Sequence, residues 1–380
     1  MNMRIGFNFY CADDYISGVE YYSLGLLRSL LDIDRQNLYI VFTNKPEIIT
    51  FHIGPHNNLI IKGCGFLKTR FSRIIWEHLR LPGIARKEKL DILHCPHYIC
   101  PVFRSSAPYV VTVHDTIAID NPKFCKKTNA AYYNIFMKPA VSTAVKIITV
   151  SNFTSGRLCE NFGVNSSKVN VIYPGIDEIF NTFQNTERLK DVQIKYNLPE
   201  KFILYCGNIE PKKNILNLLR AFKLLKLKNT KCRLVITGKR TWKSRKVWNY
   251  IQSDFYNEEI VTTGYIERQD LPWVYKSAAC LVSTSYYEGF GFSPLEAFAC
   301  RVPVAATCTG ILKEINKQAY TLLEPQSPIQ ISEAIYKLIS DDRRKEEQIK
   351  SALSEVKRFN WADCAAKTLS LYEQAVETNG

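Results

Sequence analysis

Residues 279–296 read Ala-Cys-Leu-Val-Ser-Thr-Ser-Tyr-Tyr-Glu-Gly-Phe-Gly-Phe-Ser-Pro-Leu-Glu, an apolar run of strand length, a glycine loop and a helix start. Pro294 at a first helical position, with Ser293 before it and Glu296 three residues after Ser293, has the pattern of an N-terminal capping box. A helix is therefore predicted to begin near Ser293. Its free N–H groups would face a loop whose glycines permit close approach, which predicts an anion site with the acid Glu288 beside it. Alternatively, Glu296 only closes its own capping box.

Similar apolar runs recur along the chain between stretches of helical pattern. They cover residues 4–9, 38–42, 59–61, 91–94, 109–113, 146–150 and 169–172, and later 202–206, 233–237, 260–263, 279–283 and 302–306. Because they do not alternate, they predict strands buried on both faces of parallel sheets. The polar residues from about 180 to 201 predict a linker with a short helix. We therefore expect an α/β protein of two Rossmann-like doubly wound domains, residues 1–180 and 200–360, with the active site in the cleft between them.

The composition is that of a soluble globular protein, with 46% hydrophobic and 23% charged residues. No run approaches the roughly eighteen apolar residues that a membrane span needs. Two aspartates occur before residue 15, ahead of any apolar core of a signal peptide, so a cytoplasmic protein is expected. The 12 cysteines are scattered without a C-x-x-C pair, which favours reduced, buried thiols and predicts no metal site.

The formal net charge of +14 favours a partner that carries negative charge. Between Lys62 and Lys89, eight basic residues face two glutamates, with apolar residues interleaved. Such a basic amphipathic segment is typical of peripheral contact with the anionic inner face of a membrane. It is equally typical of a helix that packs on its own sheet and leaves a solvated basic rim. Both interpretations stay open, and no nucleic-acid motif accompanies the charge.

A second anion site is predicted after the run 202–206. Gly207 and Asn208 follow this run, and Lys212 and Lys213 precede Asn214, a candidate N-cap of a helix. Lysine charge at one helix start and backbone N–H groups at the other would together stabilise a leaving nucleoside diphosphate.

In the first half of the chain, Gly18 opens a helical stretch after the first run. His114 and Asp115 follow the run 109–113, so both polar groups are expected at a carboxyl end of the sheet. The alternative for His114 is a buried histidine whose hydrogen bonds are satisfied within the fold.

Together these stretches resemble the retaining family 4 glycosyltransferases of the GT-B class. The matching segments, in the order of that family, are residues 17–27 (Ser-Gly-Val-Glu-Tyr-Tyr-Ser-Leu-Gly-Leu-Leu), 113–115 (Val-His-Asp), 147–155 (Ile-Ile-Thr-Val-Ser-Asn-Phe-Thr-Ser), 171–177 (Val-Ile-Tyr-Pro-Gly-Ile-Asp), 207–214, 263–265 (Thr-Gly-Tyr), 288–296 and 359–361 (Phe-Asn-Trp). The two glutamates of residues 288–296 are separated by seven residues, as in the family signature.

The resemblance implies a role for each matching position. Glu288 would stabilise the reacting centre beside the donor sugar, His114 would contact that sugar with Asp115 next to it, and Glu296 would hold the ribose hydroxyls. The residues implied in catalysis are Glu288, His114 and Asp115. Those implied in donor binding are Lys213, Lys212, Asn208, Gly207, Glu296, Gly291, Phe292, Ser293, Tyr265 and Gly18. The last helix, residues 361–380, would brace the first domain.

One position departs from the family. Many relatives carry arginine directly after the glycine of the phosphate loop, where this chain has Asn208. Lys212 is expected to compensate in part, although a point charge does not reproduce the planar guanidinium fork.

The expected function is metal-independent, cofactor-free retaining transfer of a hexose from a nucleotide diphosphate sugar to a glycan or lipid-linked glycan. Residues 114–116, 121–124 and 210–214 look most like the mannosyltransferase branch of bacterial surface polysaccharide synthesis, so GDP-mannose is the expected donor. A UDP- or dTDP-sugar is the alternative donor. A GT-B phosphorylase would need a lysine holding pyridoxal phosphate, which no motif marks. An inactive GT-B fold that binds membrane or RNA is the non-enzymatic alternative.

Overall fold

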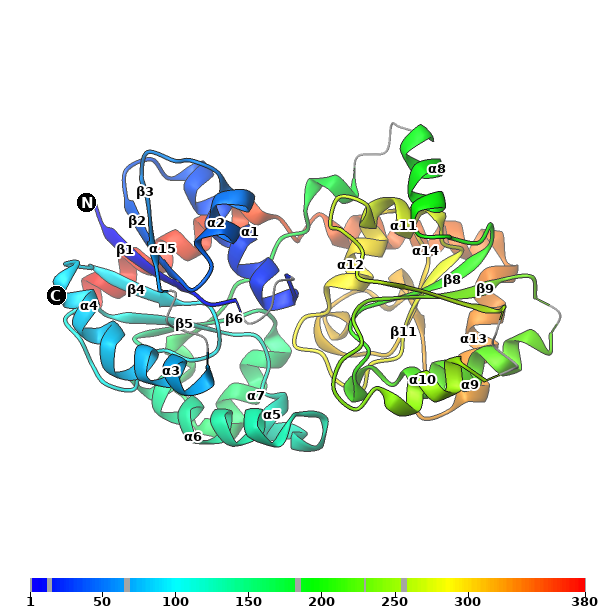
Figure 1. Cartoon of the computed structure of the whole chain (residues 1–380), viewed down its shortest axis with the longest axis horizontal. Helices are drawn as coiled ribbons and strands as arrows, with labels where there is room; N and C mark the ends of the chain where they lie inside the picture. The colour runs from blue at the N-terminus through cyan, green and yellow to red at the C-terminus, as the bar shows by residue number, and fades with distance from the viewer. Residues whose placement is uncertain are drawn as a thin grey trace. The chain divides into compact units, whose positions relative to one another are not determined.

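The computed structural model describes residues 2–11, 16–64, 69–181, 186–228, 230–253 and 258–379. The chain divides into two compact units (Figure 1). Unit 1 comprises Met1–Gly175 and Phe359–Gly380, and unit 2 comprises Ile176–Arg358.

Within the described residues, unit 1 is built on a seven-stranded parallel sheet of order β3-β2-β1-β4-β5-β6-β7. Its strands are β1 (Arg4–Phe9), β2 (Leu38–Thr43), β3 (Leu59–Gly63), β4 (Ile92–Cys95), β5 (Tyr109–Val113), β6 (Lys146–Thr149) and β7 (Val169–Val171). The central strands β4 and β5 are buried along their whole length, as their unalternated apolar sequences predict.

Helices cover both faces of this sheet (Figure 1). They are α1 (Gly18–Ile33), α2 (Pro46–Ile53), α3 (Arg70–Ile75), α4 (Leu81–Lys87), α5 (Ile117–Asp120), α6 (Lys127–Thr143), α7 (Asn152–Phe162) and α15 (Trp361–Asn379). A π-helical turn, Trp76–Arg80, joins α3 to α4. The core on one face gathers Trp76, Leu81 and Ala85 from this segment with Met137 and Ala140 of α6.

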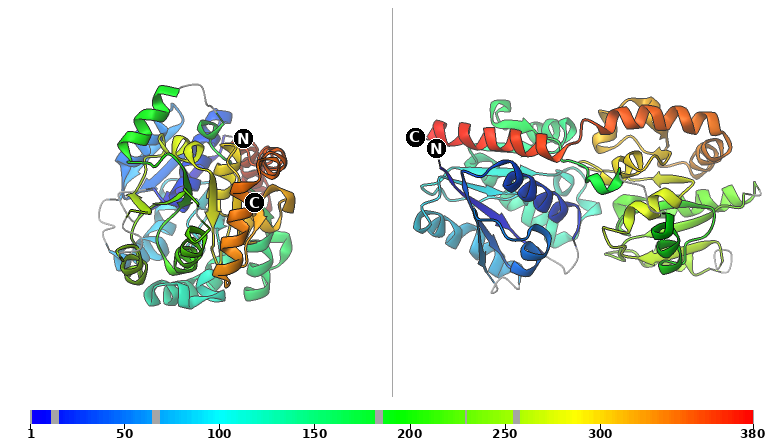
Figure 2. Two further views of the ribbon diagram at one scale, coloured as in Figure 1. Left: turned by 90° about the vertical axis from the view of Figure 1, so that its right-hand side faces the viewer. Right: turned by 90° about the horizontal axis from the view of Figure 1, so that it is seen from above.

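The C-terminal helix α15 lies beside α1, as the view from above in Figure 2 shows. Trp361, its first residue, contacts two glycines so closely that no side chain would fit there. A Cβ on Gly25 would lie 2.4 Å from Cζ2 of Trp361, and a Cβ on Gly175 would lie 2.3 Å from the Trp361 backbone nitrogen. Tyr372 adds a buried hydrogen bond of 2.6 Å to Nδ1 of His94 in β4. These contacts explain why α15 belongs to unit 1.

Unit 2 has, within the described residues, a six-stranded parallel sheet of order β10-β9-β8-β11-β12-β13. Its strands are β8 (Phe202–Cys206), β9 (Arg233–Thr237), β10 (Ile260–Gly264), β11 (Cys280–Ser283), β12 (Val304–Ala306) and β13 (Thr321–Leu322). Its helices are α8 (Thr186–Lys195), α9 (Ile215–Lys226), α10 (Arg245–Ile251), α11 (Leu271–Ser277), α12 (Phe292–Ala299), α13 (Pro328–Ser340) and α14 (Asp342–Val356). The prediction of two parallel, doubly wound α/β domains is confirmed.

The stretch predicted as a linker packs on unit 2. Phe180 is fully buried and its ring meets that of Tyr275 at a centroid distance of 6.0 Å. In α8, Arg188 and Lys195 both form ion pairs with the buried carboxylate of Asp270, at 2.5 and 2.8 Å. The division between the units therefore falls between Gly175 and Ile176, ahead of residue 180.

Candidate functional site

The sheet of unit 2 changes direction between β8 and β11, which are neighbours in space although far apart in the sequence. The chain leaves β8 toward β9 on one side and leaves β11 toward β12 on the other. In doubly wound sheets, ligands bind beyond the carboxyl ends of the strands at such a switch point. The loops that follow β8 and β11 are the two stretches predicted to bind anions.

Hydrogen bonds join these two loops directly. The backbone N–H of Tyr286 donates to the carbonyl oxygen of Lys212 at 2.8 Å. The hydroxyl of Thr284 donates to the carbonyl oxygen of Lys213 at 3.0 Å. The backbone that carries both lysines is therefore held against the loop that carries Glu288.

Glu288 and Lys213 form an ion pair at the centre of this arrangement, with Nζ of Lys213 2.6 Å from Oε1 of Glu288. The two side chains are 13% and 18% exposed, so the pair is largely shielded from water. Burial raises the pKa of Glu288, but the charges of Lys213 and Lys212 and hydrogen bonds from Lys213 and Ser285 outweigh burial and lower it. Glu288 is therefore an ionised carboxylate at neutral pH.

The other residues of the loop after β8 have contacts of their own. Lys212 lies 3.7 Å from Glu210. Gly207 has φ +147°, and the carbonyl of Asn208 accepts a hydrogen bond of 3.0 Å from the Tyr205 hydroxyl. A Cβ on Gly238, the residue after β9, would lie 2.2 Å from the Gly207 carbonyl oxygen, so the two loops require glycine here. Gly238 does not stand out in the sequence, because an isolated glycine after a strand is common.

The helix after β11 begins two residues before Pro294, the predicted first helical residue. Helix α12 starts at Phe292, and Gly291 is its N-cap with φ +97°, a conformation that favours glycine. No side chain among the described residues caps this helix start. The capping-box prediction for Ser293 and Glu296 is therefore wrong. The positive end of the helix dipole lies at Phe292 and Ser293, and it favours an anion there.

Glu296 has other partners in place of a cap. Its carboxylate accepts a hydrogen bond of 2.8 Å from the hydroxyl of Tyr275 and one of 2.6 Å from Nη1 of Arg268. The side chain of Glu296 is 4% exposed. Neither Tyr275 nor Arg268 was singled out from the sequence, since each is a single residue within a helical or polar stretch.

Two further predicted positions of unit 2 are Asn214 and Tyr265. Asn214 is the N-cap residue of α9, but its side chain donates to the Pro325 carbonyl oxygen at 2.7 Å and makes no cap bond. Its left-handed backbone, φ +56°, turns the chain from the Pro211–Lys213 turn into the helix. Tyr265 follows β10 and is 37% exposed, with Nζ of Lys239 5.9 Å from its ring centre.

In unit 1, His114 and Asp115 follow β5 as predicted, and both take part in interactions within the fold. Nε2 of His114 donates to the Pro96 carbonyl oxygen at 2.8 Å, and the ring meets that of Tyr22 edge-on at 4.7 Å. Burial lowers the pKa of His114 to about 4, and the bond to Pro96 opposes this only in part, so the ring is neutral at pH 7. Asp115 accepts from the Tyr98 hydroxyl and from the Ile117 backbone, both at 3.1 Å.

Gly18 is exposed at the start of α1. The N-cap of this helix is Ser17, whose backbone N–H donates to Oε2 of Glu20 at 3.1 Å. Residues 12–15, which connect β1 to this helix start, lie outside the described residues.

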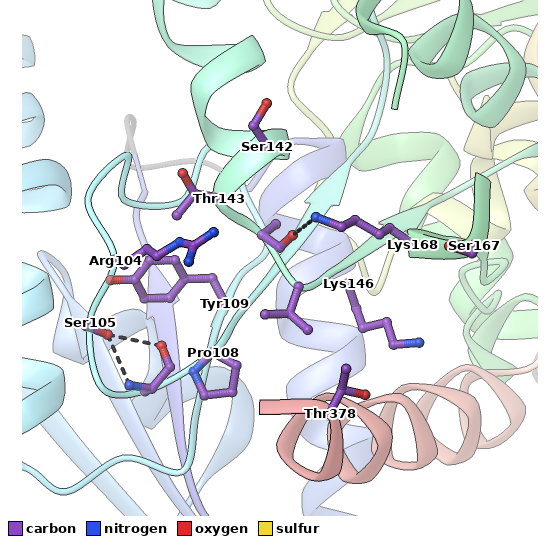
Figure 3. Close-up of a pocket in the computed structure, with 13 residues that line it drawn as sticks. Arg104, Ser105, Pro108, Tyr109, Ser142, Thr143, Lys146, Ser167, Lys168 and Thr378 are labelled. Carbon is purple, nitrogen blue, oxygen red and sulfur yellow. Dashed lines mark hydrogen bonds between the residues drawn. The ribbon is translucent and has the colours of Figure 1, made fainter. Parts of the chain in front are cut away.

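A separate pocket of about 380 Å³ in unit 1 lies at the amino ends of strands β5 and β6 (Figure 3). Tyr109 and Lys146, which begin β5 and β6, line it together with Arg104 and Lys168. Nζ of Lys168 lies 3.4 Å from a backbone carbonyl oxygen of the pocket wall. Because it borders the amino ends of the strands, this pocket is not part of the predicted site at their carboxyl ends.

Two known protein families match consecutive parts of this chain. Residues 16–179 match Glycosyltransferase Family 4, and residues 187–355 match Glycosyl transferases group 1. The O-antigen chain mannosyltransferase B of Escherichia coli is 30% identical over 300 residues, which are 78% of each chain. This chain belongs to the family 4 and group 1 glycosyltransferases. A serotype-specific mannosyltransferase of Escherichia coli, WbdA, is 24% identical over 75% of this chain, which is 36% of WbdA.

Solved structures show that this glycosyltransferase has the GT-B fold. WaaG, a glycosyltransferase involved in lipopolysaccharide biosynthesis, matches with a TM-score of 0.77 at 14% identity, over 97% of this chain and 99% of WaaG. Anabaena HepE in complex with UDP and glucose matches with a TM-score of 0.75 at 16% identity, over 98% and 100%. In the described part of the glycosyltransferase, no helix has both the length and the apolar character of a membrane span. The same residues contain no cluster of three or more His, Cys, Asp or Glu side chains able to hold a metal ion.

Proposed function

We propose that this glycosyltransferase moves a hexose, with retention of configuration, from a nucleotide diphosphate sugar to a glycan or lipid-linked glycan of a surface polysaccharide. The observation that carries the proposal is the shielded Glu288–Lys213 ion pair at the switch point of unit 2. The names of the relatives, O-antigen chain mannosyltransferase B and WbdA, support mannose as the sugar and GDP-mannose as the donor. HepE in complex with UDP-glucose supports a UDP-sugar as the alternative.

Positive charge for the leaving diphosphate would come from Lys213, Lys212 and the start of α12. An ammonium group has three N–H donors, so Lys213 is able to remain bonded to Glu288 while it donates to a phosphate oxygen. The backbone N–H groups of Phe292 and Ser293 would add the positive end of the helix dipole. These groups are fixed before the reaction, and such preorganised donors stabilise charge as it develops on the leaving group. On this basis we propose that transfer needs neither a metal ion nor a cofactor.

Departure of the diphosphate breaks the bond between the anomeric carbon and the phosphate oxygen and leaves positive, oxocarbenium-like character on the sugar. The ionised carboxylate of Glu288 would stabilise that charge. The acceptor hydroxyl would then attack from the face that the diphosphate leaves, which preserves the configuration, and would pass its proton to a phosphate oxygen. Neutral His114 would position the sugar through hydrogen bonds without adding charge, and Asp115 would hold the turn that follows it.

The segment from Lys62 to Lys89 supports a peripheral contact with an anionic membrane on the inner face. Residues 65–68 of this segment lie outside the described residues. One face of the rest packs on the sheet, as Trp76 and Leu81 show, while Phe71 and Leu79 are 72% and 63% exposed. Arg80, Arg86 and Lys87 are exposed as well. Apolar side chains exposed among basic ones suit the headgroup region of a bilayer.

The exposed basic residues Arg80, Arg86 and Lys87 also favour a second candidate function. This candidate is an inactive GT-B fold that serves as a membrane- or RNA-binding module. The two candidates differ in their response to nucleotide sugars. A donor that binds only the folded protein raises its melting temperature, whereas the module would show none of this response.

The test is a thermal-shift screen against GDP-mannose, UDP-glucose and a dTDP-sugar, followed by nuclear magnetic resonance of the product formed with a glycan acceptor. We expect stabilisation by one donor and a product whose anomeric configuration equals that of the donor. An inverted product would refute the retaining mechanism. A requirement for added Mg²⁺ after treatment with a chelator would refute metal independence. No shift with any donor, together with salt-sensitive binding to RNA or vesicles, would favour the module.

A further inference from the structure

Arg268 lies after β10 and joins three groups of unit 2. Its Nη1 donates to Oε1 of Glu296 at 2.6 Å, and its Nε donates to Oδ2 of Asp177 at 3.3 Å. Its guanidinium carbon lies 4.6 Å from the ring centre of Phe180. Asp177 and Phe180 belong to the first residues of unit 2, whereas Glu296 belongs to α12. A single side chain therefore fixes the carboxylate of α12 to the segment with which unit 2 begins.

Arg268 supplies the positive charge beside the buried Glu296 carboxylate. The Glu296 side chain is 4% exposed, and its second hydrogen-bond donor, the Tyr275 hydroxyl, is neutral. Removing the guanidinium would leave a buried carboxylate without its counter-charge, which is far more costly than the loss of one neutral hydrogen bond. A ribose hydroxyl carries no charge and does not replace a cation. Arg268 therefore stays on Glu296 when a ribose binds.

The carboxylate still has hydrogen-bonding capacity for such a ligand. An ionised carboxylate has about four acceptor positions, and Tyr275 and Arg268 occupy two of those on Glu296. The guanidinium is itself held by Asp177 and the ring of Phe180, so its hydrogen bond restricts the position of Oε1 of Glu296. The side chain of Arg268 is 30% exposed, so it is more accessible to solvent than the Glu296 carboxylate that it contacts.

We propose that Arg268 is the positioning residue that holds the Glu296 carboxylate and orients it toward the 2′- and 3′-hydroxyls of the donor ribose. This inference rests on the proposed function, because it takes Glu296 to be the group that holds the ribose. Arg268 acts through Glu296 and does not take part in bond breaking. Loss of Arg268 removes discrimination for the ribose hydroxyls and leaves the chemical step at the sugar largely intact.

The test measures binding of GDP and 2′-deoxy-GDP by calorimetry, with UDP and 2′-deoxy-UDP as the second pair, to wild type and variants whose folding is checked by circular dichroism. Wild type is expected to bind the ribonucleotide about tenfold more tightly than the deoxy form, the loss of one good hydrogen bond. Arg268→Ala is expected to reduce this ratio to about one, and Arg268→Lys to restore part of it, since lysine keeps the charge without the planar fork. Arg188→Ala removes an ion pair with Asp270 in the same unit and serves as the control, with the ratio unchanged.

The results test the donor-site assignment of Glu296 separately from the positioning role of Arg268. If Glu296→Gln keeps the wild-type ratio, or if wild type binds no nucleoside diphosphate, the donor-site assignment itself fails and this inference fails with it. If Glu296→Gln loses the ratio while both Arg268 variants keep it, only the role of Arg268 is refuted. Tighter ribonucleotide binding by Arg268→Ala would also overturn it, since the guanidinium would then occupy the position of the ribose. A fall in turnover of Arg268→Ala at saturating donor as large as its rise in KM would place Arg268 in the chemical step and contradict positioning.

Discussion

The Glu288–Lys213 ion pair predicts how the stability of unit 2 depends on pH in the variant Glu288→Gln. Glutamine keeps the shape and can still accept a hydrogen bond from Lys213, but it removes the negative charge. Breaking a fully buried pair by removal of one partner costs about 3–5 kcal/mol. Both side chains keep some exposure, 13% and 18%, and the hydrogen bond persists, so we expect a loss of about 2 kcal/mol at pH 7. For a unit of this size that loss lowers the melting temperature by about 4–8 °C.

The sign of the pH effect follows from the pKa of Glu288, which is lower in the folded state than in the unfolded chain. The ionised carboxylate therefore stabilises the fold fully at pH above its unfolded pKa of about 4.3. This contribution is lost as the pH falls through the folded-state pKa, because the protonated acid no longer attracts Lys213. The gap in stability between wild type and Glu288→Gln should be constant from pH 8 to pH 5 and shrink below pH 4.

The assay is denaturant unfolding followed by circular dichroism at several pH values, with Glu347→Gln as the control. Glu347 pairs with Arg343 on the exposed surface of α14, at 3.0 Å, and such pairs contribute little. Equal stability of wild type and Glu288→Gln at pH 7 would refute the argument. A gap that persists unchanged at pH 3.5 would refute it as well, since its origin would then not be the charge.

Three further changes test other parts of the structure. Gly25→Ala places a Cβ 2.4 Å from the Trp361 ring and should destabilise unit 1 by about 1–3 kcal/mol in denaturant unfolding. Lys213→Ala should weaken nucleoside diphosphate binding about tenfold or more in calorimetry, with a smaller loss at high salt, because a charge-assisted bond to phosphate is removed. Phe71→Ser should reduce co-sedimentation with anionic vesicles severalfold while it leaves stability unchanged, since the side chain is 72% exposed.

Matched variants keep these tests specific. Gly156→Ala adds a Cβ to α7 with nothing within 4 Å, so it should not destabilise unit 1. Lys226→Ala removes the ion pair with Glu259, at 2.9 Å, and should leave nucleotide affinity unchanged. An equal effect of Gly25→Ala and Gly156→Ala, or of the two lysine variants, would contradict the corresponding argument. Vesicle binding that survives Phe71→Ser would remove this face from the proposed membrane contact.

Much of the fold was predictable because most strands lie in continuous apolar runs, although β3 and β10 also carry polar or exposed positions. β5, β8 and β9 begin and end at the predicted residues, because their apolar residues form continuous runs and do not alternate with polar ones. β13 was not predicted, because two residues, Thr321 and Leu322, give no apolar run. The sequence predicted the end of the first domain at residue 180, whereas the division into units falls after Gly175. The polar sequence that follows Gly175 gives no sign of the buried Phe180 or of the ion pairs of α8.

The sequence predicted which loops form the candidate site, but it did not predict all the side-chain partners of the residues in them. Motif spacing located the loops after β8 and β11, and the switch point brings them together. The Ser-Pro-x-Glu pattern gave the wrong partners for Glu296, because Tyr275 and Arg268 approach it from elsewhere in the fold. Local sequence patterns describe residues three or four positions apart, whereas the partners of a buried carboxylate can lie far away in the sequence.

The most direct test of the proposed transferase is the turnover of Glu288→Gln with the donor at saturating concentration. Because the carboxylate is proposed to stabilise charge that develops only in the transition state, turnover should fall by about 10³-fold while the donor dissociation constant changes by less than about tenfold. Turnover within a few-fold of wild type would contradict the proposal that this carboxylate, held ionised by Lys213, stabilises the reacting sugar.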